Sequence, residues 1–365
     1  MTVQTLKALF RPELESLSPY RVPAEPPSVK LDANESPFPL PGAAWETILA
    51  ALHRTDLHRY PDGRAVKLRE ALAARLGGDP DSFVLGAGSD ELIALMATAL
   101  SNPRSGQPQP TVLYPDPTFV MYNKTSIAHG WRSVSIALDD TWDLDVDAMS
   151  DALARERPNL VYYARPNNPT GNSFRKERLE RLVVEYPDTL HVIDEAYGPF
   201  ASDSLADWCL EYPHCALLGT LSKVGFAAIR VGWIRLHGEL AAELDKVRQP
   251  FNLNSLSQTV ATLALTELAP TLAAQARSIA TERARLASAV AERPGLRPFP
   301  SQANFVLVGV EGDAAAVANA LLKREIAVRR FANASPRLAR CLRITVGTPE
   351  ENDRVVKALG EIPCQ

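Results

Sequence analysis

The stretch "TLHVIDEAY" (residues 189–197) predicts a buried strand that ends on a carboxylate. Val192 and Ile193 are β-branched and apolar, and Asp194 follows them directly. An acid that ends a buried strand must be paired or hydrogen-bonded if it is to remain ionised. We therefore expect a buried cation beside Asp194, with Tyr197 three residues further along the chain.

Similar short apolar runs occur on both sides of this stretch: "FVLG" from 83, "TVLYP" from 111, "NLVYYARP" from 159 and "CALLGTLSK" from 215. Amphipathic helical patterns alternate with them, for example over 89–100 and 176–186. Repeated strand and helix predict an α/β fold with a mostly parallel sheet covered on both faces. Because ligands bind at the carboxyl ends of such strands, the polar residues after each run are the candidate site.

The positions of proline and glycine along the chain predict an N-terminal arm and two domains. Residues 1–40 are rich in proline and are expected to form an extended arm that packs with the small domain or a partner subunit. Residues 41–270 would form the large domain, and an alanine-rich helical region at about 255–292 would cross its limit. Residues 271–365, with "NFVLVGV", "IAVRRF" and "CLRITVG", would form a smaller α+β domain.

The composition, 46% hydrophobic and 22% charged, is typical of a globular protein. With 39 basic and 43 acidic residues the net charge is −4, which favours neither nucleic acid nor an anionic membrane. No run approaches the roughly 18 apolar residues of a membrane span, and the first residues do not resemble a signal peptide. We expect a cytoplasmic protein whose four cysteines, lacking CxxC spacing, form no metal site.

The turn "GAGSDEL" (86–92) predicts an anion site at the start of a helix. Gly86 and Gly88 permit a tight turn, and Ser89 is expected to cap the helix while neighbouring N–H groups face outward. An ordinary capped turn explains this motif equally well. Glu91 stands where a dinucleotide fingerprint needs its third glycine, which argues against an NAD-binding dehydrogenase.

Two further clusters lie at predicted strand ends. "RPNNPTGN" (165–172) would present Asn168 as a rigid amide, although such clusters also make turns for local reasons. In "GTLSKVGFAAIRVGW" (219–233), the apolar neighbours of Lys223 predict a mostly dry site that lowers its pKa and frees the amine as nucleophile or base. A surface lysine is the alternative, but the ordered set of anion turn, amide, carboxylate and lysine fits a phosphorylated pyridine aldehyde.

"NNPTG", "VIDEAY" and "TLSK" followed by an arginine resemble the signature of fold-type I, pyridoxal-phosphate-dependent aminotransferases. Within that family, six further motifs are similar to the histidinol-phosphate aminotransferase branch: "LDANESPFP", "RYPDG", "GAGSDELI", "PDPTFVMY", "SQANFVL" and "LRITVGTPEEN". The resemblance runs from Tyr20 to Asn352, nearly the whole chain.

The resemblance implies a role for each of these residues toward pyridoxal phosphate. Lys223 would form the Schiff base with the cofactor and, once released, carry a proton to and from the substrate. Asp194 would pair with the ring nitrogen, Asn168 and Tyr197 would bond the ring oxygen, and Phe119 would stack on the ring.

The phosphate would be held by the backbone at Ser89 and Asp90, the Ser222 hydroxyl and Arg230. Tyr60 would reach the phosphate of the other subunit, so the resemblance implies a homodimer. In the family pattern eight positions separate the lysine from this arginine, whereas here the step is seven. We expect the shorter turn still to bring Arg230 to the phosphate and to alter the wall of the pocket.

At the substrate end, Arg343, Arg329 and Tyr20 match the family's positions. The implied reaction exchanges an amino group between glutamate and imidazole-acetol phosphate, forming or consuming histidinol phosphate in histidine biosynthesis by a ping-pong sequence. An aromatic or broad-specificity aminotransferase is the alternative, followed by a phosphothreonine decarboxylase or a non-catalytic regulator on the same fold. Adjacent arginines such as Arg329 and Arg330 are also typical of a solvated edge.

Overall fold

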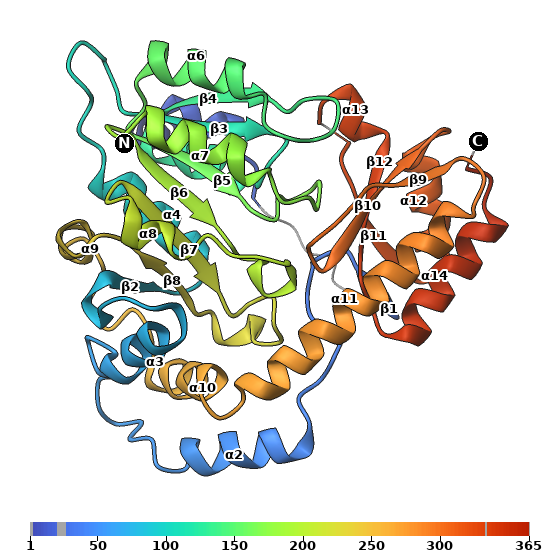
Figure 1. Ribbon diagram of the computed structural model, residues 1–365, viewed down its shortest axis with the longest axis horizontal. Helices are drawn as coiled ribbons and strands as arrows, with labels where there is room; N and C mark the ends of the chain where they lie inside the picture. Colours follow the sequence, from blue (N-terminus) through green and yellow to red (C-terminus); the bar gives the residue numbers. More distant parts are fainter. Residues whose placement is uncertain (1–2, 20–26, 333, 365) are drawn as a thin grey trace.

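A computed structural model describes residues 3–19, 27–332 and 334–364. The chain forms one sheet of seven strands and one of five. The two sheets lie side by side in Figure 1, and the long helix α11 (Ala269–Ala291) runs from beneath the larger one to the smaller one.

The seven-stranded sheet has the order β2-β8-β7-β6-β5-β3-β4. Its strands are β2 (Phe83–Gly86), β3 (Thr111–Asp116), β4 (Arg132–Ala137), β5 (Leu160–Ala164), β6 (Leu190–Asp194), β7 (Cys215–Thr220) and β8 (Gly232–Arg235). Neighbouring strands from β4 to β7 are parallel, while β8 runs antiparallel to both β7 and β2. One edge of the sheet therefore collects the carboxyl ends of the parallel strands and the amino end of β8.

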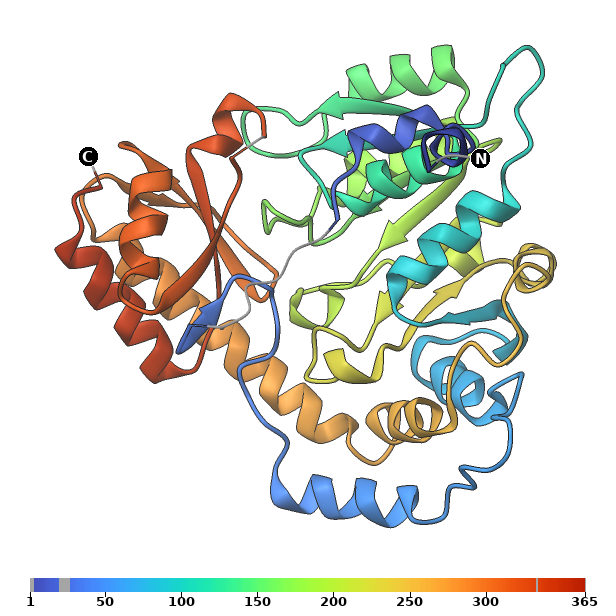
Figure 2. The same ribbon diagram turned by 180° about the vertical axis from the view of Figure 1, so that it is seen from behind.

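Helices cover both faces of this sheet because its strands are apolar on both sides. Tyr162 packs with α4, α5 and α9, whereas Tyr163, its neighbour on β5, packs with α6, α7 and α8. Figures 1 and 2 show these two layers from opposite sides. Their bounds are α4 (Ser89–Ala99), α5 (Met121–His129), α6 (Val146–Glu156), α7 (Lys176–Glu185), α8 (Trp208–Glu211) and α9 (Gly238–Asp245). The predicted α/β architecture is confirmed.

Three more helices pack together beside β2 and β8: α2 (Gly42–Leu52), α3 (Val66–Leu76) and α10 (Ser255–Leu265). Short 3-10 turns are η1 (Pro12–Ser16), η2 (Pro80–Ser82), η3 (Gly198–Phe200) and η4 (Ala227–Ile229). None of the helices within the described residues combines the length and the apolar character needed to cross a membrane.

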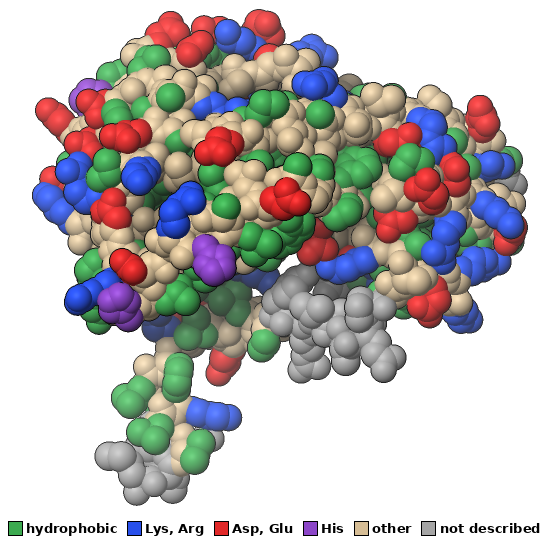
Figure 3. Space-filling view, turned by 90° about the horizontal axis from the view of Figure 1, so that it is seen from below, with side chains coloured by type: hydrophobic (Ala, Val, Ile, Leu, Met, Phe, Trp, Pro, Cys, Tyr) green, Lys and Arg blue, Asp and Glu red, His purple; other side chains and the backbone are tan. Residues whose placement is uncertain are grey.

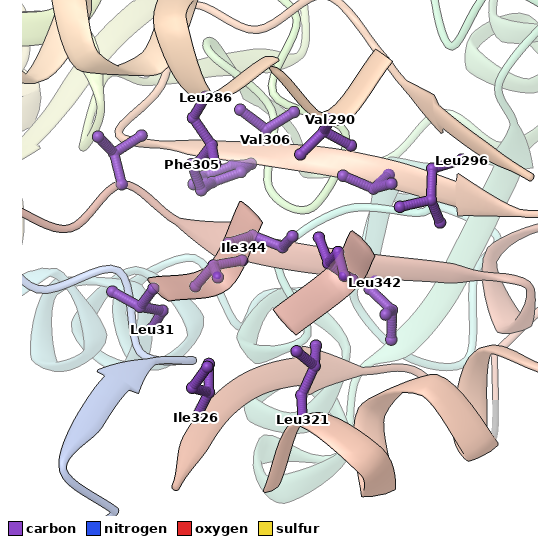
Figure 4. Packing of buried hydrophobic residues seen from close by; sticks show 14 of the residues in the cluster. Leu31, Leu286, Val290, Leu296, Phe305, Val306, Leu321, Ile326, Leu342 and Ile344 are labelled. Carbon is purple, nitrogen blue, oxygen red and sulfur yellow. The ribbon is translucent and has the colours of Figure 1, made fainter. Parts of the chain in front are cut away.

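The five-stranded sheet has the order β1-β11-β12-β10-β9. Its elements are β1 (Val29–Leu31), β9 (Leu296–Pro298), β10 (Phe305–Val310), β11 (Ile326–Arg330), β12 (Cys341–Thr345), α12 (Ala314–Leu322), α13 (Pro336–Ala339) and α14 (Pro349–Glu361). Figure 4 shows its core, in which Leu286 and Val290 of α11 lie against Phe305 and Val306 of β10. The smaller sheet is thus anchored on the helix that reaches it from the larger one.

The N-terminal residues differ from the extended arm that their prolines predict. Val3–Lys7 form a short helix, α1, and η1 begins at Pro12, because proline is compatible with the first position of a helical turn. η1 packs against α5, and β1 pairs in parallel with β11. The domain limits at residues 40 and 270 stay predictions, and position 270 falls in the first turn of α11.

The alanine-rich region is two helices rather than one, since α10 ends at Leu265 and α11 begins at Ala269. Strands β4 and β8 were not among the apolar runs that the sequence singled out. β4 lies at the sheet edge and is half-exposed, so it lacks the continuous apolar pattern of a central strand.

Candidate active site

The loops at the carboxyl edge of the large sheet bring the candidate residues into one region. Asp194 ends β6, Asn168 follows β5, and Lys223 follows β7. Arg230 comes just before β8 and reaches the same edge because β8 is antiparallel. This is the arrangement that the strand ends predict.

Asp194 is almost fully buried and is held by two hydrogen bonds. Its Oδ2 accepts from the Tyr122 hydroxyl at 2.7 Å, and its Oδ1 accepts from the Ala196 N–H at 2.9 Å. Burial raises the pKa of Asp194, although both hydrogen bonds and the nearby Lys223 charge oppose the rise. Asp194 makes no ion pair with any described residue, so the chain itself does not supply the expected buried cation.

Tyr122 was not predicted as a site residue, although it stands in the quoted motif "PDPTFVMY". It is fully buried on α5, and its ring stacks on Tyr162 at 4.2 Å between centroids. Burial and the neighbouring Asp194 carboxylate hold the pKa of Tyr122 well above its usual range. Tyr122 therefore remains a hydrogen-bond donor to Asp194. Phe119 is half-buried and meets the Tyr122 ring edge-on at 5.6 Å.

Lys223 is half-buried, and its Nζ lies 5.7 Å from the centroid of the Tyr197 ring. The expectation of a mostly dry site is correct for Leu221 and Phe226, which are buried, but not for Ala228, which is exposed. The turn after β7 is thus partly exposed, and Lys223 is only partly enclosed.

The turn after β2 meets Ser222 and Arg230. The Arg230 guanidinium donates to Ser222 Oγ at 3.3 Å and lies 3.5 Å from Asp90 Oδ2. Gly88 has φ +84°, and a Cβ there would lie 2.5 Å from Arg230 Nη2. A Cβ on Gly232 would lie 2.7 Å from the Ser89 backbone nitrogen. Both glycines thus permit a close approach that a side chain would prevent.

The prediction that Ser89 caps α4 is wrong. Gly88 occupies the cap position without a side-chain bond, and Ser89 is the first helical residue. The Glu91 carboxylate instead accepts a hydrogen bond from the Ala87 N–H and a second from Asn252 Nδ2. The residue that excluded the dinucleotide fingerprint therefore stabilises the turn.

Asn168 and Arg343 come together from the two sheets. Arg343 is buried on β12 and donates to Asn168 Oδ1 at 2.6 Å and to the Asp32 carbonyl oxygen at 2.7 Å. A site that includes both residues is consequently closed on one side by the five-stranded sheet.

The family model for aminotransferase class I and II matches residues 26–359. The chain belongs to this family. Over 97% of its length the chain is 42% identical to the histidinol-phosphate aminotransferase of Methylibium petroleiphilum, and it covers 94% of that relative. Over 97% of its length it is also 40% identical to histidinol-phosphate aminotransferase 1 of Burkholderia lata, and it covers 98% of that protein. A crystal structure of histidinol-phosphate aminotransferase from Sinorhizobium meliloti in complex with pyridoxal-5'-phosphate superposes with a TM-score of 0.86 at 28% identity, covering 97% of each chain.

Two predicted residues of this aminotransferase, Tyr60 and Arg329, are exposed rather than enclosed in the cluster. Tyr60 is 82% exposed and stacks on Phe251 at 4.7 Å between ring centroids. Arg329 is exposed on β11, opposite Arg343 in the strand register. Tyr20 lies outside the described residues.

The seven-residue step from Lys223 to Arg230 is accommodated by a compact turn in the aminotransferase. η4 shortens the path, Gly225 has φ +100°, and Arg230 itself has the left-handed φ of 52°. A left-handed conformation costs about 1–2 kcal/mol at a residue with a Cβ such as Arg230. The shorter turn brings Arg230 to Ser222, while its role toward the phosphate stays a prediction.

Proposed function

We propose that this chain is a pyridoxal-phosphate-dependent aminotransferase that exchanges an amino group between glutamate and imidazole-acetol phosphate, with histidinol phosphate as the other amino donor. Its place would be in histidine biosynthesis. The proposal is supported by membership of the aminotransferase family and by relatives of that name that match almost the whole chain.

One observation carries the cofactor assignment. Asp194 is a buried carboxylate whose only hydrogen-bond donors among the described residues are Tyr122 and Ala196, and burial raises its pKa. A cation beside such a group favours its ionised form. A protonated pyridine nitrogen is a cation of suitable size, and the amine of Lys223 is near enough for its charge to act on Asp194. The residues present therefore fit pyridoxal phosphate.

The phosphate end of the cofactor would lie at the turn after β2. Arg230 and Ser222 supply a charge and a hydroxyl, and the free N–H groups at the start of α4 favour an anion. Asp90 reduces this positive charge and would have to give up its contact with Arg230. Asn168 and Tyr197 would hold the ring oxygen, with Phe119 against the face of the ring.

When bound, pyridoxal phosphate supplies an electron-withdrawing ring that stabilises negative charge on the substrate carbon from which a proton is removed. Asp194 would keep the proton on the ring nitrogen through a charge-assisted hydrogen bond, and Tyr122 keeps Asp194 ionised. Lys223 Nζ would hold the cofactor at rest and then accept and return the proton of the substrate carbon. The two half-reactions would use the same residues in turn.

The substrate end would be formed by arginines. Arg343 is enclosed between Asn168 and Asp32, where its planar guanidinium can bind a carboxylate in bidentate fashion. Arg329 is exposed beside it on β11 and is assigned to the substrate phosphate, together with Tyr20.

We further propose a cytoplasmic homodimer. The aromatic pair of Tyr60 and Phe251 is exposed, and Tyr60 would reach the partner's phosphate site. Figure 3 shows the N-terminal segment standing out from the molecule with apolar side chains uncovered; Leu9 is 79% and Phe10 69% exposed. Uncovered apolar groups of this kind are typical of an interface. The four cysteines are free and buried, as expected of reduced thiols.

The experiment that tests the substrate is a steady-state comparison of histidinol phosphate and phenylalanine as donors to 2-oxoglutarate, in the wild type and in Arg329→Ala. Loss of a charged hydrogen bond to the phosphate should lower kcat/KM for histidinol phosphate about 10- to 100-fold and leave phenylalanine almost unchanged. Arg330→Ala, an exposed arginine one position away, is the matched control. Equal losses for both donors would contradict the role of Arg329. A wild type that prefers phenylalanine would indicate the aromatic alternative, and release of carbon dioxide without 2-oxoglutarate would indicate a decarboxylase.

A further inference from the structure

Asn34 is a buried residue in the connection after β1, and it carries an unusual number of hydrogen bonds. It is 2% exposed and has the left-handed φ of 55°. Its backbone N–H donates to Thr345 Oγ1 at 3.0 Å, and its carbonyl oxygen accepts from Asn304 Nδ2 at 3.0 Å. Its side chain bonds both Thr345 and Tyr197. Asparagine tolerates this backbone conformation, so the strain is small and the side chain is held in one place.

The network determines which way the Asn34 amide faces. Thr345 Oγ1 accepts from the Asn34 N–H, and its single proton is donated to Asn34 Oδ1 at 3.0 Å. Thr345 Oγ1 has no other hydrogen-bond partner among the described residues, so its buried proton finds an acceptor only when the amide oxygen faces it. This orientation leaves Nδ2 to donate to the Tyr197 hydroxyl oxygen at 2.8 Å. Because Tyr197 accepts this bond, its own proton is available to a second acceptor.

We propose that Asn34 is a positioning residue that directs the Tyr197 hydroxyl proton into the active site. This inference rests on the proposed function, in which Tyr197 donates to the ring oxygen of pyridoxal phosphate. A hydroxyl that accepts a hydrogen bond becomes a stronger donor, so Asn34 strengthens the donation by Tyr197 and favours the ionised ring oxygen. Thr345 acts one step further away by fixing the amide.

The same bond joins the two sheets. Asn34 and Thr345 belong to the five-stranded sheet and its connections, whereas Tyr197 follows β6 of the seven-stranded sheet. The donor strength of Tyr197 thus depends on the five-stranded sheet being seated against the cofactor site. A displacement that separates Asn34 from Tyr197 would weaken the hold on the ring oxygen.

The test is a pH titration of the visible absorption band of the cofactor-bound protein, without substrate. Asn34→Gly keeps the left-handed backbone and removes the amide, so the midpoint should rise by about 0.5 pH units. Asn34→Asp replaces the donor by a carboxylate that accepts the Tyr197 proton, so the midpoint should rise further, by about 1 unit or more. In a Tyr197→Phe background, Asn34→Gly should cause no further shift.

A second pair of variants avoids changing Asn34. Thr345→Val removes the hydroxyl that orients the amide and should move the midpoint in the same direction as Asn34→Gly, whereas Thr345→Ser keeps the hydroxyl and should leave it at the wild-type value. A purely structural role would alter the melting temperature of these variants but not the midpoint. Unchanged midpoints in Asn34→Gly, Asn34→Asp and Thr345→Val would overturn the inference. A wild type that binds no pyridoxal phosphate would instead overturn the proposed function, so the two failures are distinguishable.

Discussion

Tyr122→Phe removes one oxygen atom from the interior and tests how the buried carboxylate is held. The Tyr122 hydroxyl donates to Asp194 Oδ2 at 2.7 Å, and both side chains are almost inaccessible to water. Phenylalanine keeps the ring, so its stacking on Tyr162 is retained and the change is confined to the hydrogen bond. We expect the cofactor-free protein to lose stability.

The size of the loss follows from the charge of the acceptor. A hydrogen bond to a charged group contributes about 1.5–3 kcal/mol, whereas one between neutral groups contributes about 1 kcal/mol. The loss should therefore be about 2 kcal/mol at any pH above the raised pKa of Asp194, where the carboxylate is ionised. The pKa of Asp194 is already raised by burial, and loss of the bond raises it further. As the pH falls through that raised pKa, Asp194 takes up a proton and the loss should shrink to about 1 kcal/mol.

The assay is urea unfolding of the cofactor-free protein between pH 5 and pH 8, with Tyr163→Phe as the matched control. Tyr163 neighbours Tyr162 on β5 and is equally buried, but its hydroxyl bonds no described residue. Its removal should be neutral or stabilising because the unpaired hydroxyl is costly to bury. If Tyr122→Phe were no less stable than Tyr163→Phe at pH 8, the hydrogen bond would not be supporting a charged Asp194.

Two further substitutions test the ends of the proposed cofactor site. Gly88→Ala places a Cβ against Arg230 in a backbone region that is essentially restricted to glycine, so it should lower the free energy of unfolding by about 1–3 kcal/mol and weaken cofactor binding. Thermal melting and cofactor titration measure the two effects. Gly42→Ala, whose Cβ would meet nothing within 4 Å, is the control and should change neither. Asp194→Asn should stabilise the cofactor-free protein at pH 8 but not at pH 4, since a raised carboxyl pKa penalises folding increasingly as the pH rises above its unfolded value. The same variant should lose aminotransferase activity, and a variant that is less stable at pH 8 would contradict the burial argument.

The large sheet could be predicted because its central strands are apolar on both faces and end on polar residues. Asp194, Asn168 and Lys223 were found by this rule, which needs only the period of the sequence and the direction of parallel strands. Strand β8 was missed, yet it brings Arg230 to the site, because a single antiparallel strand of four residues leaves no distinct periodic signal.

The supporting residues could not be found in the same way. Tyr122 lies on a helix and Asn34 in an irregular connection, and each acts through a partner more than 70 residues away in the sequence. Nothing in local periodicity identifies such a partner. Both residues do lie within motifs on which the family resemblance rests, "PDPTFVMY" and "LDANESPFP". A polar residue of such a motif that has no assigned role was therefore the one sequence signal that could have identified them.

The turn between β7 and β8 also explains how a family could vary the step from lysine to arginine. Thr220 pairs with Gly232, and the Leu221 N–H donates to the Val231 carbonyl oxygen at 3.0 Å, so both ends of the turn are fixed by the strand register. A deletion between these ends shortens the loop without shifting either strand. The number of residues between the lysine and the arginine is thus set by the length of this loop, and the loop could be lengthened or shortened by design without changing the sheet.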